Sequence, residues 1–422
     1  MANIAKADYP ADAANAVMQS CLALIPDHTE RVYLAYSGGL DSSVLLHLLV
    51  TNQHRYSLVP WHVNHGLLEV AGRMEQFCVE QSQRYGLELR LDHLDLGNID
   101  SNIEAEARRQ RYRLFAAAND AGSCIVTAHH ADDQAETFLL NALRGSGSAG
   151  LRGIARSREL GSGLLLRPLL EFSRQQLEDY ASQHELAWFN DPSNRDNRFD
   201  RNYLRNEVIP AIRARWPQYQ QALATTSRLQ AETQQILDEV AQLDYEALSK
   251  PGRGNDFTLD IEGLLQLTNE RARNLLRYWV ANAGLGTVPG ARLREVMSQL
   301  HAKPGSMPQI AMQKYSIRSY DQRLFLVHND ALRARQGVFE FGLNEDISIA
   351  QFEVSLCRAD LFRLLRIDDQ AQQVTLRYPG SDHRPADRHR LKRLYQKHRI
   401  PPWLRPSTAQ VYLDDKLVGL LP

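Results

Sequence analysis

The sequence is poor in cysteine, and this scarcity excludes two common ways of holding a domain together. Its four cysteines, Cys21, Cys78, Cys124 and Cys357, are scattered through 422 residues and form no Cys-x-x-Cys pair. A disulfide framework needs a high density of cysteines, usually in a short secreted chain, and a structural zinc site needs cysteines or histidines at close, regular spacing. We therefore expect neither, and we expect the protein to work in a reducing compartment, the cytoplasm.

Long apolar runs and a net charge are lacking as well. No run of about 18 apolar residues occurs, and the opening MANIAKADYP has no basic segment followed by an apolar one. We therefore expect neither secretion nor a membrane partner. The formal net charge is -1, so that any nucleic acid must be bound by a locally basic surface rather than by overall charge.

The chain is long enough for several cores, because chains beyond about 250 residues usually split into domains. Between residues 31 and 143, strand-like apolar segments alternate with helical patterns, which predicts βαβ units and a parallel sheet. The predicted strands are Arg31–Tyr36, Ser57–Val63, Leu87–Leu94 and Ser123–His129, and the predicted helices are Ser42–Leu49, Val70–Arg84, Asn102–Asp120 and Asp132–Leu143.

The pattern changes after this region. The glycine-rich segment Arg144–Gly153 predicts a flexible loop, and Ser173 with Gln176 forms a capping-box pattern that predicts the start of a helix. One long polar helix is expected over 217–244, then a helical unit, and short alternating strands beyond residue 329. The fold prediction is α/β: a doubly wound parallel sheet over 1–216, a helical domain over 217–330 and a small α+β domain over 331–422.

The strongest motif is Ser37–Ser42, SGGLDS, which lies where a predicted strand ends and a helix begins. Such a junction attracts anions, because backbone N–H groups are unpaired there and the helix dipole is positive. Paired glycines let the chain approach a phosphate closely, and Asp41 is suited to hold Mg²⁺ against it. A capped helix start after a glycine turn is the plainer alternative. The residues predicted to bind ATP are Ser37, Gly38, Gly39, Leu40, Asp41 and Ser42.

A second motif, Thr127–Thr137, also follows a predicted strand, so it is expected at the same carboxyl edge of the sheet. Asp133 and Glu136 are three residues apart and share a helix face that suits a cationic group or a metal. In isolation, the pattern would favour Asp132 as a helix cap with the other carboxylates solvated. Its position beside the phosphate loop favours a binding site, and the two preceding histidines are equally consistent with phosphate contacts and with ordinary loop residues.

Together with further segments, these motifs make the sequence resemble the tRNA(Ile)-lysidine synthetase family of the PP-loop ATP pyrophosphatase superfamily. The resemblance implies an adenine nucleotide α hydrolase-like first domain. The matching segments are SGGLDS at Ser37–Ser42, HVNHGL at His62–Leu67, NIEAEARRQRY at Asn102–Tyr112, TAHHADDQAET at Thr127–Thr137, RGSG at Arg144–Gly147, RPLL at Arg167–Leu170, NDPSN and RNYLRNEVIP within Asn190–Pro210, and KRLYQKHRIPPWLR at Lys392–Arg405.

The resemblance implies a defined reaction. ATP would adenylate the C2 carbonyl oxygen of the wobble cytidine in a tRNA(Ile) with a CAU anticodon, and the ε-amine of free L-lysine would then displace AMP. Transferred by position, Ser37–Ser42 bind ATP, Asp133 and Glu136 recognise lysine, and Asp41, Asp133 and Arg109 act in catalysis. Arg109 and its neighbour Arg108 are also consistent with ordinary surface arginines that pair along the helix.

Two basic segments, 195–215 and 377–405, are candidates for RNA binding, because clustered Lys and Arg neutralise backbone phosphates. A solvated basic face explains each segment equally well. Trp403, after two prolines, either contacts RNA or anchors a core. The residues predicted to contact tRNA are Arg201, Arg205, Lys392, Arg393 and Arg405.

Two other functions compete with this one. A PP-loop tRNA thiolation enzyme would need closely grouped thiolates, which the scattered cysteines do not provide. A non-catalytic tRNA-binding protein would have no use for the acidic residues Asp41, Asp133 and Glu136. The oligomeric state, including a homodimer, stays open.

Overall fold

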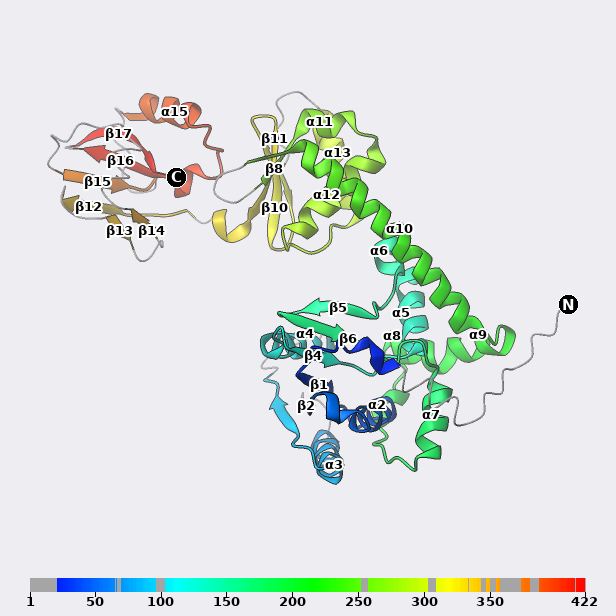
Figure 1. Ribbon diagram of the computed structural model, residues 1–422. Helices are drawn as coiled ribbons and strands as arrows, with labels where there is room; N and C mark the ends of the chain where they lie inside the picture. Colours follow the sequence, from blue (N-terminus) through cyan, green and yellow to red (C-terminus); the bar gives the residue numbers. More distant parts are fainter. Residues whose placement is uncertain are drawn as a thin grey trace. The chain divides into compact units, whose positions relative to one another are not determined.

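The computed structural model describes residues 21–64, 66, 70–95, 103–251, 257–302, 309–332, 334–342, 347–349, 354–356, 373–379, 387–413 and 415–421 (Figure 1). Cys357 and parts of the matching segments near His62–Leu67 and at Asn102 lie outside the described residues. The chain divides into two compact units, Met1–Gln235 and Ile236–Pro422, at a point inside one long helix. The division into three domains stays a prediction.

A six-stranded sheet forms the centre of the first unit. Its strand order is β3-β2-β1-β4-β6-β5, and every neighbouring pair is parallel except the hairpin β5–β6. The predicted parallel sheet is confirmed; β1, β3 and β4 are shorter than predicted, and β2 is one residue longer. The strands are β1 (Arg31–Ala35), β2 (Ser57–Asn64), β3 (Arg90–His93), β4 (Ser123–Val126), β5 (Ser157–Leu160) and β6 (Gly163–Leu166).

Helices cover both faces of this sheet, because alternate residues of its strands point to opposite sides. In β1, Val32 and Leu34 join a core that includes residues of α2 and α7, whereas Tyr33 joins a second core with Phe115 of α4. The helices of the first unit are α2 (Leu40–Val50), α3 (Ala71–Arg84), α4 (Ile103–Ala118), α5 (Ala131–Leu143), α6 (Ser148–Leu151), α7 (Arg174–Gln183), α8 (Asp200–Tyr203), a π-helix (Leu204–Val208) and α9 (Ile209–Arg215).

Two local predictions have different outcomes. The helix α7 begins as predicted, with Ser173 and Gln176 forming a capping box. The glycine-rich segment Arg144–Gly153, predicted as a flexible loop, contains the short helix α6 and is held by a hydrogen bond from Asn141 to the Gly150 carbonyl. Because Gly150 packs closely on Ser146, small residues here serve packing as well as turning.

The sheet order fixes where a ligand can bind. The chain passes from β1 to β2 on one side, while β4 lies on the other side of β1. The direction of the strand order therefore reverses between β1 and β4, and open α/β sheets bind ligands outside the carboxyl ends of the strands at such a point. The loop Ser37–Ser42 follows β1 and the motif Thr127–Thr137 follows β4.

The second unit contains more sheet than the sequence analysis expected. Its first part packs helices on a five-stranded antiparallel sheet of order β7-β8-β11-β10-β9, and a shared core of residues such as Leu276 and Ile317 joins the two layers. The elements are α10 (Tyr219–Leu248), which enters from the first unit, β7 (Ser249–Pro251), β8 (Phe257–Asp260), α11 (Ile261–Gln266), α12 (Asn269–Asn282), α13 (Gly290–Ala302), β9 (Gln309–Ala311), β10 (Tyr315–Tyr320) and β11 (Arg323–His328).

The C-terminal part combines a four-stranded antiparallel sheet of order β12-β15-β16-β17 with one helix and a separate hairpin, β13–β14. This agrees with the predicted α+β character. The elements are β12 (Val338–Gly342), β13 (Ile347–Ile349), β14 (Val354–Leu356), β15 (Gln373–Arg377), α15 (Arg388–Lys397), β16 (Ala409–Leu413) and β17 (Lys416–Leu421). Within the described part of the chain, no helix has both the length and the apolar composition needed to cross a bilayer.

Candidate active site

The glycine-rich loop has the backbone that its sequence predicts. Gly38 has a φ of 77°, and a Cβ on it would lie 2.9 Å from the Cys78 sulfur, so both conformation and space require glycine. Gly39 is the N-cap of α2, and because glycine has no side chain, it makes no capping hydrogen bond to the first turn. The N–H groups of that turn therefore remain available to an anion.

Hydrogen bonds within the loop hold this shape. The hydroxyl of Ser42 donates to the Gly39 carbonyl at 3.0 Å, and the Ser37 and Ser42 hydroxyls lie 3.0 Å apart. From outside the loop, the Phe189 N–H donates to the Gly38 carbonyl at 2.8 Å. The two serines predicted to bind ATP thus lie side by side at the start of α2.

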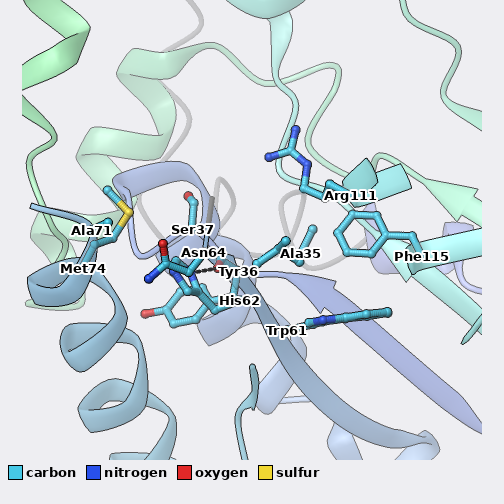
Figure 2. Close-up of a pocket in the computed structure, with 11 residues that line it drawn as sticks. Ala35, Tyr36, Ser37, Trp61, His62, Asn64, Ala71, Met74, Arg111 and Phe115 are labelled. Carbon is cyan, nitrogen blue, oxygen red and sulfur yellow. Dashed lines mark hydrogen bonds between the residues drawn. The ribbon is translucent and has the colours of Figure 1, made fainter. Parts of the chain in front are cut away.

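A pocket opens beside the loop, between the ends of β1 and β2 and the helices α3 and α4 (Figure 2). Met74 of α3 and Arg111 of α4 lie on opposite sides of it in Figure 2. His62 forms part of its wall, and its Nδ1 donates to the Tyr36 carbonyl at 2.9 Å. Burial lowers the pKa of His62, so its ring is neutral and its tautomer is fixed. Because Ser37 also lines the pocket, a nucleoside placed here would have its phosphates at the loop.

His130 connects the phosphate loop with the acidic helix α5. It is 1% exposed, and its Nε2 lies 3.7 Å from Asp41 Oδ2 and 3.6 Å from Asp133 Oδ2, while its Nδ1 lies 3.6 Å from Asp132 Oδ2. Burial opposes the charged form, but the three carboxylates outweigh it and raise the pKa of His130 to about 10. His130 is therefore a buried imidazolium at neutral pH.

The neighbouring His129 has the opposite character. Its Nδ1 lies 2.8 Å from the Thr127 hydroxyl. Burial, together with Arg167, Arg108 and Arg201, lowers the pKa of His129 to about 3 against the pull of Asp133. The sequence analysis treated the two histidines as equivalent, and the structure makes one cationic and the other neutral.

Asp133 and Glu136 share a helix face as predicted, but that face is occupied by two arginines. Glu136 is 0% exposed, and its two oxygens accept from Arg201 Nε at 2.6 Å and from Arg205 Nε at 2.7 Å. Asp133 is 14% exposed and accepts from Arg201 at 2.8 Å. These arginines come from α8 and from the π-helix, a distortion that often accompanies functional sites. Residues predicted to contact tRNA therefore pair with those predicted to recognise lysine.

Asp132, the first carboxylate of α5, forms hydrogen bonds that join helices rather than capping its own. The helix cap is made by Asp133, whose carboxylate accepts from the His130 N–H at 3.0 Å. Asp132 instead accepts from the Arg174 N–H at 2.8 Å and from the Tyr219 hydroxyl at 2.9 Å, which ties α5 to α7 and α10. The alternative that the pattern would favour in isolation, with Asp132 as the helix cap and its neighbours solvated, is therefore excluded.

Sequence reasoning missed Arg174, which lies beside the predicted magnesium ligand. Its guanidinium approaches Asp41 at 3.3 Å, and the Asp41 side chain remains 27% exposed. Arg174 follows the predicted cap Ser173, but no spacing in the sequence connects it with Asp41, 133 residues earlier. Only the close packing of α2 on α7 brings the two together.

The remaining predicted residues lie elsewhere. Arg109 pairs with Glu106 and lines a different pocket, whereas Arg111, two residues later on α4, lines the pocket beside the glycine-rich loop, which is the predicted nucleotide pocket. Lys392 and Arg393 are exposed on α15 in the second unit. Arg405 is half-buried, with its guanidinium 5.2 Å from the centre of the Tyr395 ring.

The packing of Trp403 favours a structural role. Its ring lies 5.6 Å from the Phe325 ring and 6.2 Å from the Tyr320 ring, both in T-shaped arrangements. Arg318 stacks on it at 5.5 Å. Of the two alternatives left by the sequence, the anchor accounts for these contacts.

Comparison with known proteins identifies the family. A PP-loop domain model matches residues 13–212, a TilS substrate binding domain matches 259–325, and a TilS substrate C-terminal domain matches 373–420. The tRNA(Ile)-lysidine synthase of Serratia proteamaculans (strain 568) is 38% identical over 92% of this chain and 90% of its own. That of Coxiella burnetii (strain RSA 493 / Nine Mile phase I) is 34% identical over 92% and 88%.

This chain belongs to the tRNA(Ile)-lysidine synthase family. As a member of that family, it is a tRNA-modifying enzyme that uses ATP. The matches extend beyond the PP-loop domain into the second unit, where both substrate-domain models align. Membership in the tRNA(Ile)-lysidine synthase family does not favour the thiolation or non-catalytic alternatives.

Proposed function

We propose that this enzyme ligates free L-lysine to C2 of the wobble cytidine in a tRNA(Ile) with a CAU anticodon. The product is lysidine, and AMP and pyrophosphate are released by way of an adenylated tRNA. The observation that supports this most is His130, within 4 Å of both Asp41 and Asp133. It brings a phosphate loop and an acidic helix into one crevice. We also propose that the enzyme works in the cytoplasm, where its tRNA substrate is found.

In the first step, the C2 oxygen of the cytidine attacks the α-phosphorus of ATP, and the bond to pyrophosphate breaks. The first turn of α2 would bind the phosphates through its free N–H groups, with the Ser37 and Ser42 hydroxyls beside them. Negative charge grows on the departing pyrophosphate, and the fixed cations His130 and Arg174 near Asp41 are placed to stabilise it.

The site fits a magnesium ion. Mg²⁺ commonly binds one or two carboxylates and takes phosphate oxygens and waters as its other ligands. Asp41 offers a partly exposed carboxylate in the first turn of α2, next to the loop. It would hold the ion, which neutralises phosphate charge when bound.

In the second step, the ε-amine of lysine attacks C2, the bond from C2 to the adenylated oxygen breaks, and AMP leaves with that oxygen. The acidic face of α5 would attract the lysine ammonium before it loses a proton. Asp133 offers the direct contact because its carboxylate is partly exposed. Glu136 is fully enclosed by Arg201 and Arg205, so that it would contact lysine only after one of them has moved.

Mass analysis of the tRNA tests this proposal. An unmodified tRNA(Ile) transcript with a CAU anticodon is incubated with the enzyme, ATP, Mg²⁺ and L-lysine. The wobble nucleotide should gain lysine with loss of water, and AMP should form only when tRNA is present. Asp41→Asn should lose AMP formation and keep tRNA binding, while the exposed Asp179→Asn should retain both. AMP release without tRNA, or an unmodified nucleotide, would contradict the proposal.

A further inference from the structure

A second pocket on α4 is lined almost entirely by cationic side chains. Unlike the nucleotide pocket, it lies between the N-terminal half of α4 and the hairpin β5–β6, together with Arg167, which directly follows β6. We call it the arginine pocket. Its lining residues are Ala105, Arg108, Arg109, Tyr112, Arg158 and Arg167.

The positive charge of the arginine pocket is largely uncompensated. Its lining contains no Asp or Glu, and among the described residues only Arg109 has a carboxylate partner, Glu106. Arg108 and Arg158 both stack on the Tyr112 ring, at 4.9 and 5.2 Å from its centre. Two guanidiniums held on one ring, without an anion between them, form a site that is arranged for a negatively charged ligand.

Arg167 provides a second, independent sign of a missing ligand. It is 5% exposed, its Nη1 donates to the Ala155 carbonyl, and its buried Nε has no hydrogen-bond acceptor in the described structure. Burial, Arg158 and Arg108 lower the pKa of Arg167, although Tyr112 acts in the opposite direction. A buried donor that faces like charges is costly unless an acceptor reaches it.

The position of the arginine pocket places it near the reaction. Arg167 directly follows β6, and the Thr127 N–H that opens the acidic motif donates to the carbonyl of the preceding Leu166 at 3.0 Å. The arginine pocket therefore opens at the same carboxyl edge of the sheet as the active site. The same helix α4 sends Arg111 into the nucleotide pocket, so the two pockets are neighbours but separate.

We propose that the arginine pocket is a phosphate site distinct from the PP-loop, and that it holds a backbone phosphodiester of the tRNA substrate. Planar guanidiniums match the oxygens of a phosphate, and Arg167 at the floor with Arg108 and Arg158 at the rim would contact it from several sides. The phosphates of ATP already have a site at α2. This inference rests on the proposed function, because it takes tRNA as the substrate.

Paired variants test the proposal. Arg108→Gln/Arg158→Gln changes two exposed rim residues and keeps the buried Arg167. Arg113→Gln/Arg152→Gln is the matched control, because it removes the same charge from exposed positions outside the pocket. The affinity for a tRNA(Ile) transcript is measured over a series of salt concentrations, and the affinity for ATP with Mg²⁺ is measured in parallel.

The rim variant should bind tRNA about tenfold more weakly at low salt. The slope of log affinity against log salt should become shallower by about 0.7, the value for one phosphate of a single strand. The control should keep the parent slope, and both variants should keep the parent affinity for ATP. Equal slopes in the rim variant and the control would overturn the proposal, and so would a loss of ATP affinity without a loss of tRNA affinity.

The proposed function fails in a different way. If the parent enzyme transfers no lysine, yet the rim variant loses one phosphate from its salt slope, the arginine pocket remains an RNA site and only the reaction is wrong. If lysine is transferred and the slope does not change, the reaction remains and the arginine pocket does not bind RNA.

Discussion

Replacing Glu136 by glutamine should destabilise the first unit strongly. Glu136 is 0% exposed and holds Arg201 and Arg205 through three hydrogen bonds of 2.6 to 3.0 Å. Removing one partner of a buried ion pair costs about 3–5 kcal/mol, because the other charge stays behind uncompensated. Arg201 and Arg205 are 37% and 29% exposed, so solvent screens part of the loss and we expect about 2–3 kcal/mol.

The matching thermal shift is about 4–12 °C for a unit of this size. It is measured on the first unfolding transition by circular dichroism. Glu178→Gln is the control, because Glu178 pairs with Arg174 along one helix and both side chains are more than one-third exposed. That variant should shift the transition by no more than about 2 °C. Equal shifts in the two variants would refute the assignment of Glu136 as the anchor of the arginine pair.

A second substitution separates charge imbalance from lost packing. If the destabilisation comes from uncompensated guanidiniums, adding Arg205→Gln to Glu136→Gln should recover part of the loss. If the double variant is as unstable as the sum of the two single variants, the charges are not coupled and the reasoning fails.

Three other measurements examine the site and the RNA surface. Gly38→Ala should lower the unfolding temperature and abolish ATP binding, because the φ of Gly38 is 77° and the added Cβ would meet Cys78. Gly39→Ala is the control and should keep the fold, because Gly39 has an ordinary φ and room for a Cβ. Equal stability of the two variants would contradict this reasoning. His130 has a folded pKa of about 10 against an ordinary 6.5, so the stability that its charge gives is complete below 6.5 and is lost as pH rises toward 10. The free energy of unfolding, measured with denaturant over that pH range, should therefore fall more steeply for the parent than for His130→Asn. Parallel curves for the two proteins would refute the assignment of His130 as a buried cation. Lys392→Gln/Arg393→Gln on α15 should flatten the salt dependence of tRNA binding, and an unchanged slope would make that surface structural.

The fold and the phosphate loop were accessible from the sequence because their information is local. The alternation of strands and helices gives the parallel sheet, and the position of Ser37–Ser42 at a strand-to-helix junction predicts an anion site there. Even the need for glycine at position 38 follows from local backbone geometry, although the contact with Cys78 does not. The sheet of the middle region was missed because the periodicity of its helices is the stronger signal in the sequence.

The pairing of charged side chains in the site could not be predicted from the sequence. Glu136 and Arg205 are 69 residues apart, and Asp41 and Arg174 are 133 apart, so no spacing rule connects them. The sequence also left the capping residue of α5 open, with Asp132 as one alternative, because the register of a helix start depends on where the strand before it stops. The strand β4 ends at Val126, which leaves His130 as the N-cap and makes Asp133 the residue that reaches back.

Pairing with carboxylates changes how clustered arginines should be weighed as RNA contacts, because a cation that already faces a carboxylate gains less from a phosphate. In the arginine-rich segment 195–215, Arg198, Arg201, Arg205 and Arg213 all face carboxylates. An arginine that is already neutralised attracts few counterions, and so releases few when RNA binds. In the arginine pocket, Arg108, Arg158 and Arg167 are scattered in sequence but have no carboxylate partner among the described residues. We therefore expect the guanidiniums of the arginine pocket, which face no carboxylate among the described residues except at Arg109, to contact the tRNA more strongly than the carboxylate-paired arginines do.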